Sequence, residues 1–121
     1  MASKPSEDDR AERGKRLALT RSNARLAATQ ALYQWEATGA KPAAVIKEFT
    51  DFRLGEVVDD VALPPADLKL FTLVVTGAAA NVEELDDMIA AVLTEDWTVE
   101  RLEATLRAIL RCGVFELAHR E

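Results

Sequence analysis

The amino-acid sequence predicts an all-α domain, and three observations favour that fold class. Apolar residues recur at helical spacing in five stretches, which is the pattern of amphipathic helices. No stretch of useful length alternates apolar and polar residues with the period of two that marks a half-buried strand. Gly39, Pro42 and the Pro64-Pro65 pair fall between the periodic stretches, where such residues end and begin helices. We therefore expect a bundle of about five helices.

The first two helices are expected between residues 20 and 52. Thr20 or Ser22 is a suitable N-cap for the first helix, and Gly39 is a suitable C-cap. Pro42 fits the first turn of the second helix. The expected buried faces consist of Ala24, Ala27, Ala28, Ala31, Leu32 and Trp35 in the first helix, and of Val45, Ile46, Phe49 and Phe52 in the second.

Three more helices are expected after an irregular connection over residues 55–65. The third begins near Pro65-Ala66-Asp67, the fourth follows Asn81, and the fifth begins at Thr98 as N-cap. Their expected apolar faces are, in order, Leu68, Phe71, Val74, Val75 and Ala78; then Val82, Leu85, Met88, Ile89, Val92 and Leu93; then Leu102, Leu106, Ile109, Leu110, Gly113, Val114 and Leu117.

The composition fits a single domain in the cytoplasm. The chain has 121 residues, of which 49% are apolar, and this is enough for a modest core. No apolar run approaches the roughly 20 residues of a membrane span, and the polar start is unlike a signal peptide. The single cysteine, Cys112, excludes an internal disulfide. We expect a disordered tail over residues 1–15, because this segment carries charges of both signs and the helix-breaking residues Pro5 and Gly14. A helical domain is expected over residues 16–121.

Positive charge is concentrated at the start of an acidic protein. The formal net charge is −6, yet residues 1–25 carry seven Lys and Arg against four Asp and Glu. The remaining residues carry eight basic against seventeen acidic side chains. A basic end followed by aromatic residues on the same helix favours binding of a single-stranded nucleic acid over binding of a membrane.

The first helix contains the candidate binding residues. Arg21, Arg25, Thr29 and Tyr33 follow one another at a spacing of four and form a ridge along the helix. Arginine makes bidentate contacts with phosphate, tyrosine stacks on an unpaired base, and Gln30 is suited to reading a base edge. The alternative is that the two arginines are merely solvated and the tyrosine packs at the rim of the core.

Two motifs give the chain a resemblance to a known family. Arg21-Ser-Asn-Ala-Arg25, followed by Ala28-Thr-Gln-Ala-Leu-Tyr-Gln-Trp-Glu36, resembles the opening helix of the NusB family of bacterial transcription antitermination factors. Ile109-Leu-Arg-Cys-Gly-Val-Phe-Glu-Leu117 is similar to the other strong signature of that family. The segments between them, Asp67 to Phe71, Leu73 to Gly77, Leu85-Asp86 and Trp97, agree in order and spacing.

The resemblance implies a non-enzymatic, all-helical protein. It would bind the boxA element of nascent single-stranded RNA together with the ribosomal small-subunit protein NusE, as part of the antitermination complex of RNA polymerase in ribosomal RNA operons. The RNA-binding residues carried over are Lys15, Arg16, Arg21, Arg25, Gln30 and Tyr33. The protein partner would dock mainly on the later helices. Some family members also form homodimers through the RNA surface.

The sequence departs from the family at two places. Ser22 and Asn23 occupy positions that are often basic, which affects the expected affinity. The family also continues for two more helices after the Phe-Glu-Leu motif, whereas this chain stops at Glu121. We therefore expect a bundle without the last two helices, an exposed apolar groove on the fifth helix, and, as a hypothesis, a truncated chain.

No catalytic, metal or cofactor site is predicted. His119 lies near the end of the chain, and Cys112 is expected to be a buried thiol rather than a nucleophile. A zinc site needs about four Cys or His ligands, and the chain has one of each. The sequence contains no glycine-rich loop of the phosphate-binding kind. Arg111 and Glu116 are expected to be ion-pair or capping residues of the fold rather than ligands. Two other functions stay open: the RNA-binding domain of an RNA methyltransferase, and a helical protein-interaction module.

Overall fold

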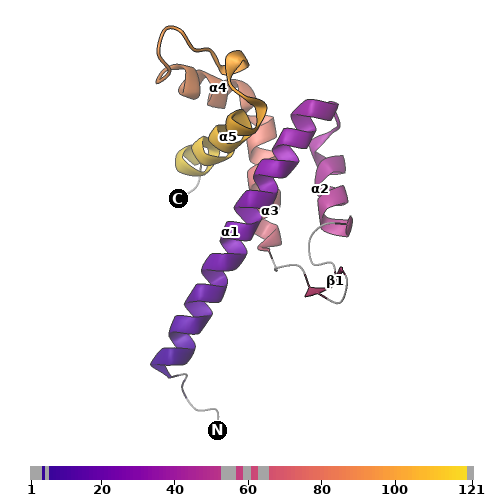
Figure 1. The fold of residues 1–121 in the computed structure, drawn as a ribbon, viewed down its shortest axis with the longest axis vertical. Helices are drawn as coiled ribbons and strands as arrows, with labels where there is room; N and C mark the ends of the chain where they lie inside the picture. Colours follow the sequence, from indigo (N-terminus) through magenta and orange to yellow (C-terminus); the bar gives the residue numbers. More distant parts are fainter. Residues whose placement is uncertain (1–3, 5, 53–56, 59–60, 63–65, 120–121) are drawn as a thin grey trace.

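The computed structural model of the protein describes residues 4, 6–52, 57–58, 61–62 and 66–119. The described helices are α1 (Glu7–Thr38), α2 (Pro42–Phe52), α3 (Leu68–Ala80), α4 (Val82–Ala90) and α5 (Ala104–His119), with a 3-10 turn η1 (Val99–Arg101) before α5. Two-residue strands β1 (Val57–Val58) and β2 (Val61–Ala62) pair antiparallel between α2 and α3. Apart from this short ladder the described fold is helical, and the predicted five-helix, all-α class is confirmed (Figure 1).

Helix α1 is the longest element, and α2, α3 and α5 pack along its C-terminal half. It contacts α3, α5 and α2, while α4 packs on α5 (Figure 1). The core lies between these helices. In it the ring centroids of Phe49 and Phe71 lie 5.8 Å apart, and Leu32 and Val74 of the same cluster are fully buried. The predicted alanine face of α1 is buried, and these small side chains allow the neighbouring helices to approach closely. None of the described helices has the length and apolar character needed to cross a membrane.

Helix α1 begins much earlier than the sequence predicted. Its N-cap is Ser6, whose hydroxyl accepts a hydrogen bond from the backbone N–H of Asp9 at 3.1 Å, while the Asp9 carboxylate accepts one from the Ser6 N–H at 3.3 Å. This capping box and the acidic first turn stabilise the helix start. The prediction of a disordered tail is therefore wrong over residues 7–15, and neither Thr20 nor Ser22 is a cap. Residues 1–3 and 5 lie outside the described part. At the other end, Gly39 is the C-cap with φ of 70°, as predicted.

The predicted starts of the second and third helices are confirmed. Pro42 is the first residue of α2, and α3 is capped by Asp67, whose carboxylate accepts a hydrogen bond from the Leu70 N–H at 3.0 Å. The side chain of Phe52 and most of the predicted connection over residues 55–65 lie outside the described residues. In the fourth helix, Leu85 and Ile89 are buried as expected, whereas Val92 lies beyond the helix end and is exposed.

The fifth helix differs from its prediction in start and in buried face. Thr98 caps only η1, and α5 begins at Ala104, because the Glu103 carboxylate accepts hydrogen bonds from the N–H groups of Thr105 and Leu106. The buried residues of α5 are Ala108, Arg111, Cys112 and Phe115. The predicted face is therefore partly wrong: Leu106, Ile109 and Leu117 are exposed. These three side chains provide the apolar surface that was expected on this helix.

Candidate nucleic-acid interface

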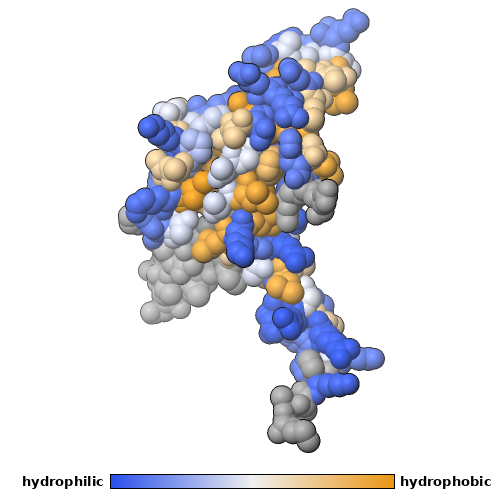
Figure 2. Space-filling view, turned by 180° about the vertical axis from the view of Figure 1, so that it is seen from behind, coloured by the Kyte–Doolittle hydropathy of each residue, from blue (hydrophilic) through white to orange (hydrophobic). Residues whose placement is uncertain are grey.

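The N-terminal part of α1 extends beyond the helical body and forms what we call the arm, residues 7–19. Figure 1 shows this end of α1 projecting away from the other helices, and Figure 2 shows its largely hydrophilic surface. All side chains of the arm are exposed. The arm joins the body at Thr20, whose carbonyl accepts a hydrogen bond from the Asp67 N–H at 3.0 Å. Its basic residues are therefore accessible along several turns of helix.

The predicted basic residues of the first helix do not share one face. At about 100° per residue, Arg21 and Arg25 lie about 40° apart, whereas Lys15 lies about 120° and Arg16 about 140° from Arg21, in opposite directions. All four side chains are exposed. Only Arg21 and Arg25 therefore present their guanidinium groups to one side of the helix, next to where the arm meets the body.

Arg25 is held in place by an ion pair with α5. Its Nε lies 2.9 Å from Oε1 of Glu116, and its Nη2 lies 3.1 Å from Oε2 of the same carboxylate. These hydrogen bonds with Glu116 raise the pKa of the Arg25 guanidinium above its usual value. The prediction that Glu116 pairs within the fold is confirmed. Half of the Arg25 side chain is still exposed, so the ion pair orients this residue without burying it.

A second set of ion pairs connects α1, α4 and α5. Arg111 is buried and pairs with both Glu36 and Asp86, with 2.7 Å between its Nη2 and Oδ2 of Asp86. Arg107 also pairs with Glu36 and donates hydrogen bonds to the carbonyls of Val99 and Leu102. The contacts with Arg107 and Arg111 lower the pKa of the Glu36 carboxyl group. The predicted internal pairing of Arg111 is confirmed, and this network fixes α5 against α1.

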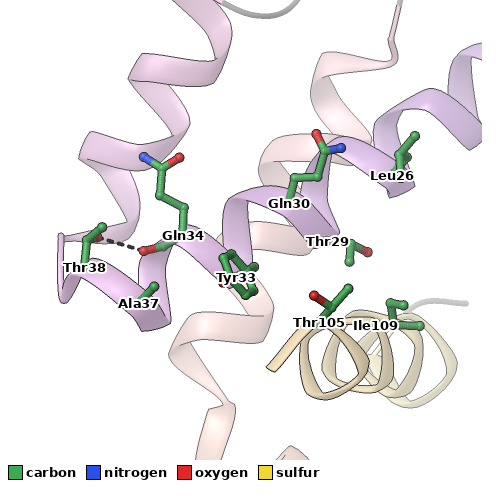
Figure 3. A pocket seen from close by; sticks show the side chains of 9 residues that line it. All are labelled: Leu26, Thr29, Gln30, Tyr33, Gln34, Ala37, Thr38, Thr105 and Ile109. Carbon is green, nitrogen blue, oxygen red and sulfur yellow. Dashed lines mark hydrogen bonds between the residues drawn. The ribbon is translucent and has the colours of Figure 1, made fainter. Parts of the chain in front are cut away.

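Gln30 and Tyr33 lie in an apolar groove between α1 and α5. Figure 3 shows both side chains on α1, with Thr105 and Ile109 on the neighbouring α5 near Tyr33 and with Gln30 directed away from α5. The groove has a volume of about 630 Å³, and the residues that line it are uncharged: Leu26, Thr29, Gln30, Tyr33, Gln34, Ala37, Thr38, Thr105 and Ile109. Tyr33 is 44% exposed, and Ile109 is 49% exposed. The groove offers a place for apolar side chains or an unpaired base, but no cation for phosphate.

The structure thus separates the predicted site residues into two groups. Arg21 and Arg25 form a basic surface, Gln30 and Tyr33 form part of the groove, and Lys15 and Arg16 belong to neither. Sequence reasoning missed the contribution of α5, because Thr105 and Ile109 come close to α1 only in the folded chain. Ile109 is half exposed, whereas the helical spacing predicts it on the buried face of the fifth helix.

The described residues contain no group of three or more His, Cys, Asp and Glu side chains arranged to hold a metal ion. Cys112 is buried, and its burial raises the pKa of the thiol to about 11, so the thiol is protonated at neutral pH. The basic surface and the groove therefore offer arginine, amide and aromatic groups for contacts with a ligand.

Comparisons with known proteins agree with this arrangement of motifs and helices. Residues 22–121 match the model of the NusB family. A protein of Rhizobium leguminosarum bv. trifolii named transcription antitermination protein NusB is 42% identical over 114 residues, covering 94% of this chain and 71% of the relative. Proteins of the same name from Mesorhizobium japonicum and Brucella ovis are 45% and 46% identical, covering 84% and 88% of this chain and 65% and 62% of the relatives. The chain therefore belongs to the NusB family.

Proposed function

We propose that this protein is a transcription antitermination factor that binds single-stranded RNA of the boxA type from ribosomal RNA operons. The observation that carries the proposal is membership of a family whose relatives are named transcription antitermination proteins. Nascent RNA would place the site of action in the bacterial cytoplasm. The accessible arginines on α1 support the RNA part of the proposal, because guanidinium groups bind phosphate in a bidentate manner.

The RNA contacts are assigned to the side of α1 that carries Arg21 and Arg25. Glu116 holds the Nε edge of Arg25, so the opposite edge of the guanidinium is directed away from α5. This orientation reduces the side-chain entropy that Arg25 would lose on binding a phosphate. Lys15 and Arg16 lie on other sides of the helix, and we assign to them only long-range attraction of the RNA.

A protein partner is assigned to the apolar groove between α1 and α5. Tyr33, Leu26 and Ile109 expose apolar surface there, and aromatic residues are enriched where proteins dock. The partner implied by the family resemblance is the ribosomal small-subunit protein NusE. Gln30 would then contribute a hydrogen bond at the edge of this interface. Stacking of Tyr33 on an RNA base stays a competing prediction for the same side chain.

The test is fluorescence anisotropy of a labelled boxA-type strand and of a scrambled strand, titrated with this protein in the presence and absence of NusE. We expect preference for the boxA strand and tighter binding when NusE is present. Sedimentation velocity at the same concentrations would show whether a homodimer competes with RNA. Equal binding of both strands, with no effect of NusE, would contradict the proposed function.

Two substitutions separate the roles of the two surfaces. Arg21→Gln should weaken RNA binding and make the logarithmic salt slope shallower by about 0.7, because one phosphate contact is lost. Tyr33→Ala should weaken binding of NusE and leave RNA binding by the protein alone nearly unchanged. A loss of roughly 1–3 kcal/mol in RNA affinity for Tyr33→Ala without NusE would instead assign this residue to base stacking.

A further inference from the structure

The arm carries a stripe of arginines that the predicted RNA site did not include. Arg10, Arg13, Leu17 and Arg21 lie within about 80° of arc on α1 and extend over about 16 Å of helix. All four side chains are exposed. On the body, the same side of the helix carries the buried alanines, so the stripe continues the core-facing side of α1 past the point where the core ends.

Charge is segregated around the arm. The acidic residues of the arm all lie outside the arc of the stripe; they are Glu7, Asp8, Asp9 and Glu12. The stripe therefore presents three guanidinium groups around Leu17 without an intervening carboxylate on the same arc. A surface of this kind attracts a ligand that carries several negative charges in a row.

We propose that the stripe is a binding surface for the phosphate backbone of single-stranded RNA, which extends the RNA site outward from Arg21 to Arg13 and Arg10. This inference rests on the proposed function. It goes beyond the family match, which begins at residue 22, whereas the arm precedes that residue. Arg21 joins the two parts, because it belongs both to the basic surface beside Arg25 and to the inner end of the stripe.

The charge distribution favours RNA as the occupant of the stripe. Residues 26–121 carry an excess of nine acidic side chains, so the body repels a polyanion while the first 25 residues attract it. A flexible strand bound at Arg25 therefore avoids the acidic body by following the arm along the arc that carries arginines and no carboxylate. Leu17, which is 46% exposed, supplies an apolar surface for a ribose or base between the arginines. The groove with Tyr33 lies on the opposite side of α1, so a protein partner would not obstruct the stripe.

The experiment compares two double substitutions that remove the same charge from the same arm. Arg10→Gln/Arg13→Gln removes the outer part of the stripe, and Lys15→Gln/Arg16→Gln removes two cations from other sides of the helix. Glutamine preserves helix propensity, and far-ultraviolet circular dichroism would confirm equal helicity. The affinity for the boxA-type strand is measured by fluorescence anisotropy across a range of salt concentrations. NusE is left out of these titrations.

The stripe variant should bind RNA about tenfold more weakly at low salt, and its logarithmic salt slope should be shallower by about 1.4, the value for two phosphates. The control variant should lose less affinity and keep a slope close to that of the unmodified protein. Equal losses in the two variants would show that only the total charge of the arm matters and would overturn the inference. An unchanged affinity for the stripe variant would overturn it too.

Hydrogen exchange provides a second readout that does not depend on affinity. Saturating RNA should slow exchange of the backbone amides of residues 7–19 in the unmodified protein and less so in the stripe variant. Unchanged exchange in the arm, with RNA bound, would place the strand elsewhere. If the unmodified protein binds boxA-type and scrambled RNA alike, the proposed function fails; if it discriminates between them and the stripe variant binds normally, only the stripe assignment fails.

Discussion

Two glycines in the packed helices show how much depends on the surroundings of a single residue. A Cβ atom added to Gly77 of α3 would overlap the ring of the buried Phe115 on α5. A Cβ atom added to Gly113 of α5 would meet nothing within 4 Å. Both glycines lie inside helices, where glycine costs up to about 1 kcal/mol relative to alanine. Gly77 therefore permits close approach of α3 and α5, whereas Gly113 is not required by packing.

Gly77→Ala should lower the free energy of unfolding by about 1–3 kcal/mol, because the Phe115 ring must move from its packed position. Gly113→Ala is the matched control and should raise this free energy by up to about 1 kcal/mol through helix propensity alone. Urea unfolding followed by circular dichroism measures both changes. A destabilised Gly113→Ala variant, or a neutral Gly77→Ala variant, would contradict this account of the α3–α5 contact.

At the scale of elements, α1 consists of two parts that are stabilised differently. The part after Thr20 is fixed by packing against α3 and α5, with a face of buried alanines. The arm has exposed side chains, so its helical structure depends on local terms such as the capping box of Ser6 and Asp9. The arm is therefore the element in which small sequence changes should have the largest local effect.

Ser6→Ala should destabilise the arm by about 1 kcal/mol, because the Asp9 N–H loses its acceptor. Gly14→Ala should stabilise it by a similar amount, since nothing lies within 4 Å of the added Cβ atom. Hydrogen exchange of the arm amides should accelerate in the first variant and slow in the second. The unfolding midpoint of the body should stay constant in both; a shift of several degrees would show that the arm is packed against it.

At the scale of the whole molecule, the network of Glu36, Asp86, Arg107 and Arg111 joins three helices around a buried guanidinium. The pKa of the Glu36 carboxyl group is lowered by these contacts. Folding therefore favours the ionised carboxylate. The stabilisation from Glu36 is fully present above its pKa in the unfolded chain and is lost as the pH falls through its lower pKa in the folded protein.

Glu36→Gln should lower the free energy of unfolding by about 2 kcal/mol at pH 7, because Arg107 and Arg111 lose a charged partner. The difference from the unmodified protein should shrink as the pH falls below about 4, where the carboxyl group of the unmodified protein becomes protonated. Glu95→Gln is the control, since Glu95 is exposed, and should change stability by less than about 0.5 kcal/mol. Urea titrations between pH 3 and pH 7 measure the difference in unfolding free energy between Glu36→Gln and the unmodified protein. A difference that does not change with pH would refute the role of Glu36.

The helix ends that could be predicted from the sequence are those set by interactions within one turn of the chain. The starts of α2 and α3 and the end of α1 follow from residues whose backbone preferences act within one turn, namely Pro42, Asp67 and Gly39. The start of α1 was missed because the mixed charges of residues 7–12 resemble a disordered segment, although Asp9 among them forms a capping box with Ser6.

The sequence alone determined the fold class, the four alanines that line the core side of α1, and the family, because helical periodicity and the two end motifs are properties of the chain itself. Only the tertiary structure decided which face of α5 is buried, since Arg111 turns inward to reach Glu36 and Asp86 on other helices. The tertiary structure also decided the surroundings of Tyr33, because the groove forms only where Ile109 of α5 meets α1. Contacts between residues far apart in sequence depend on how whole helices pack, and spacing along the chain does not encode them directly.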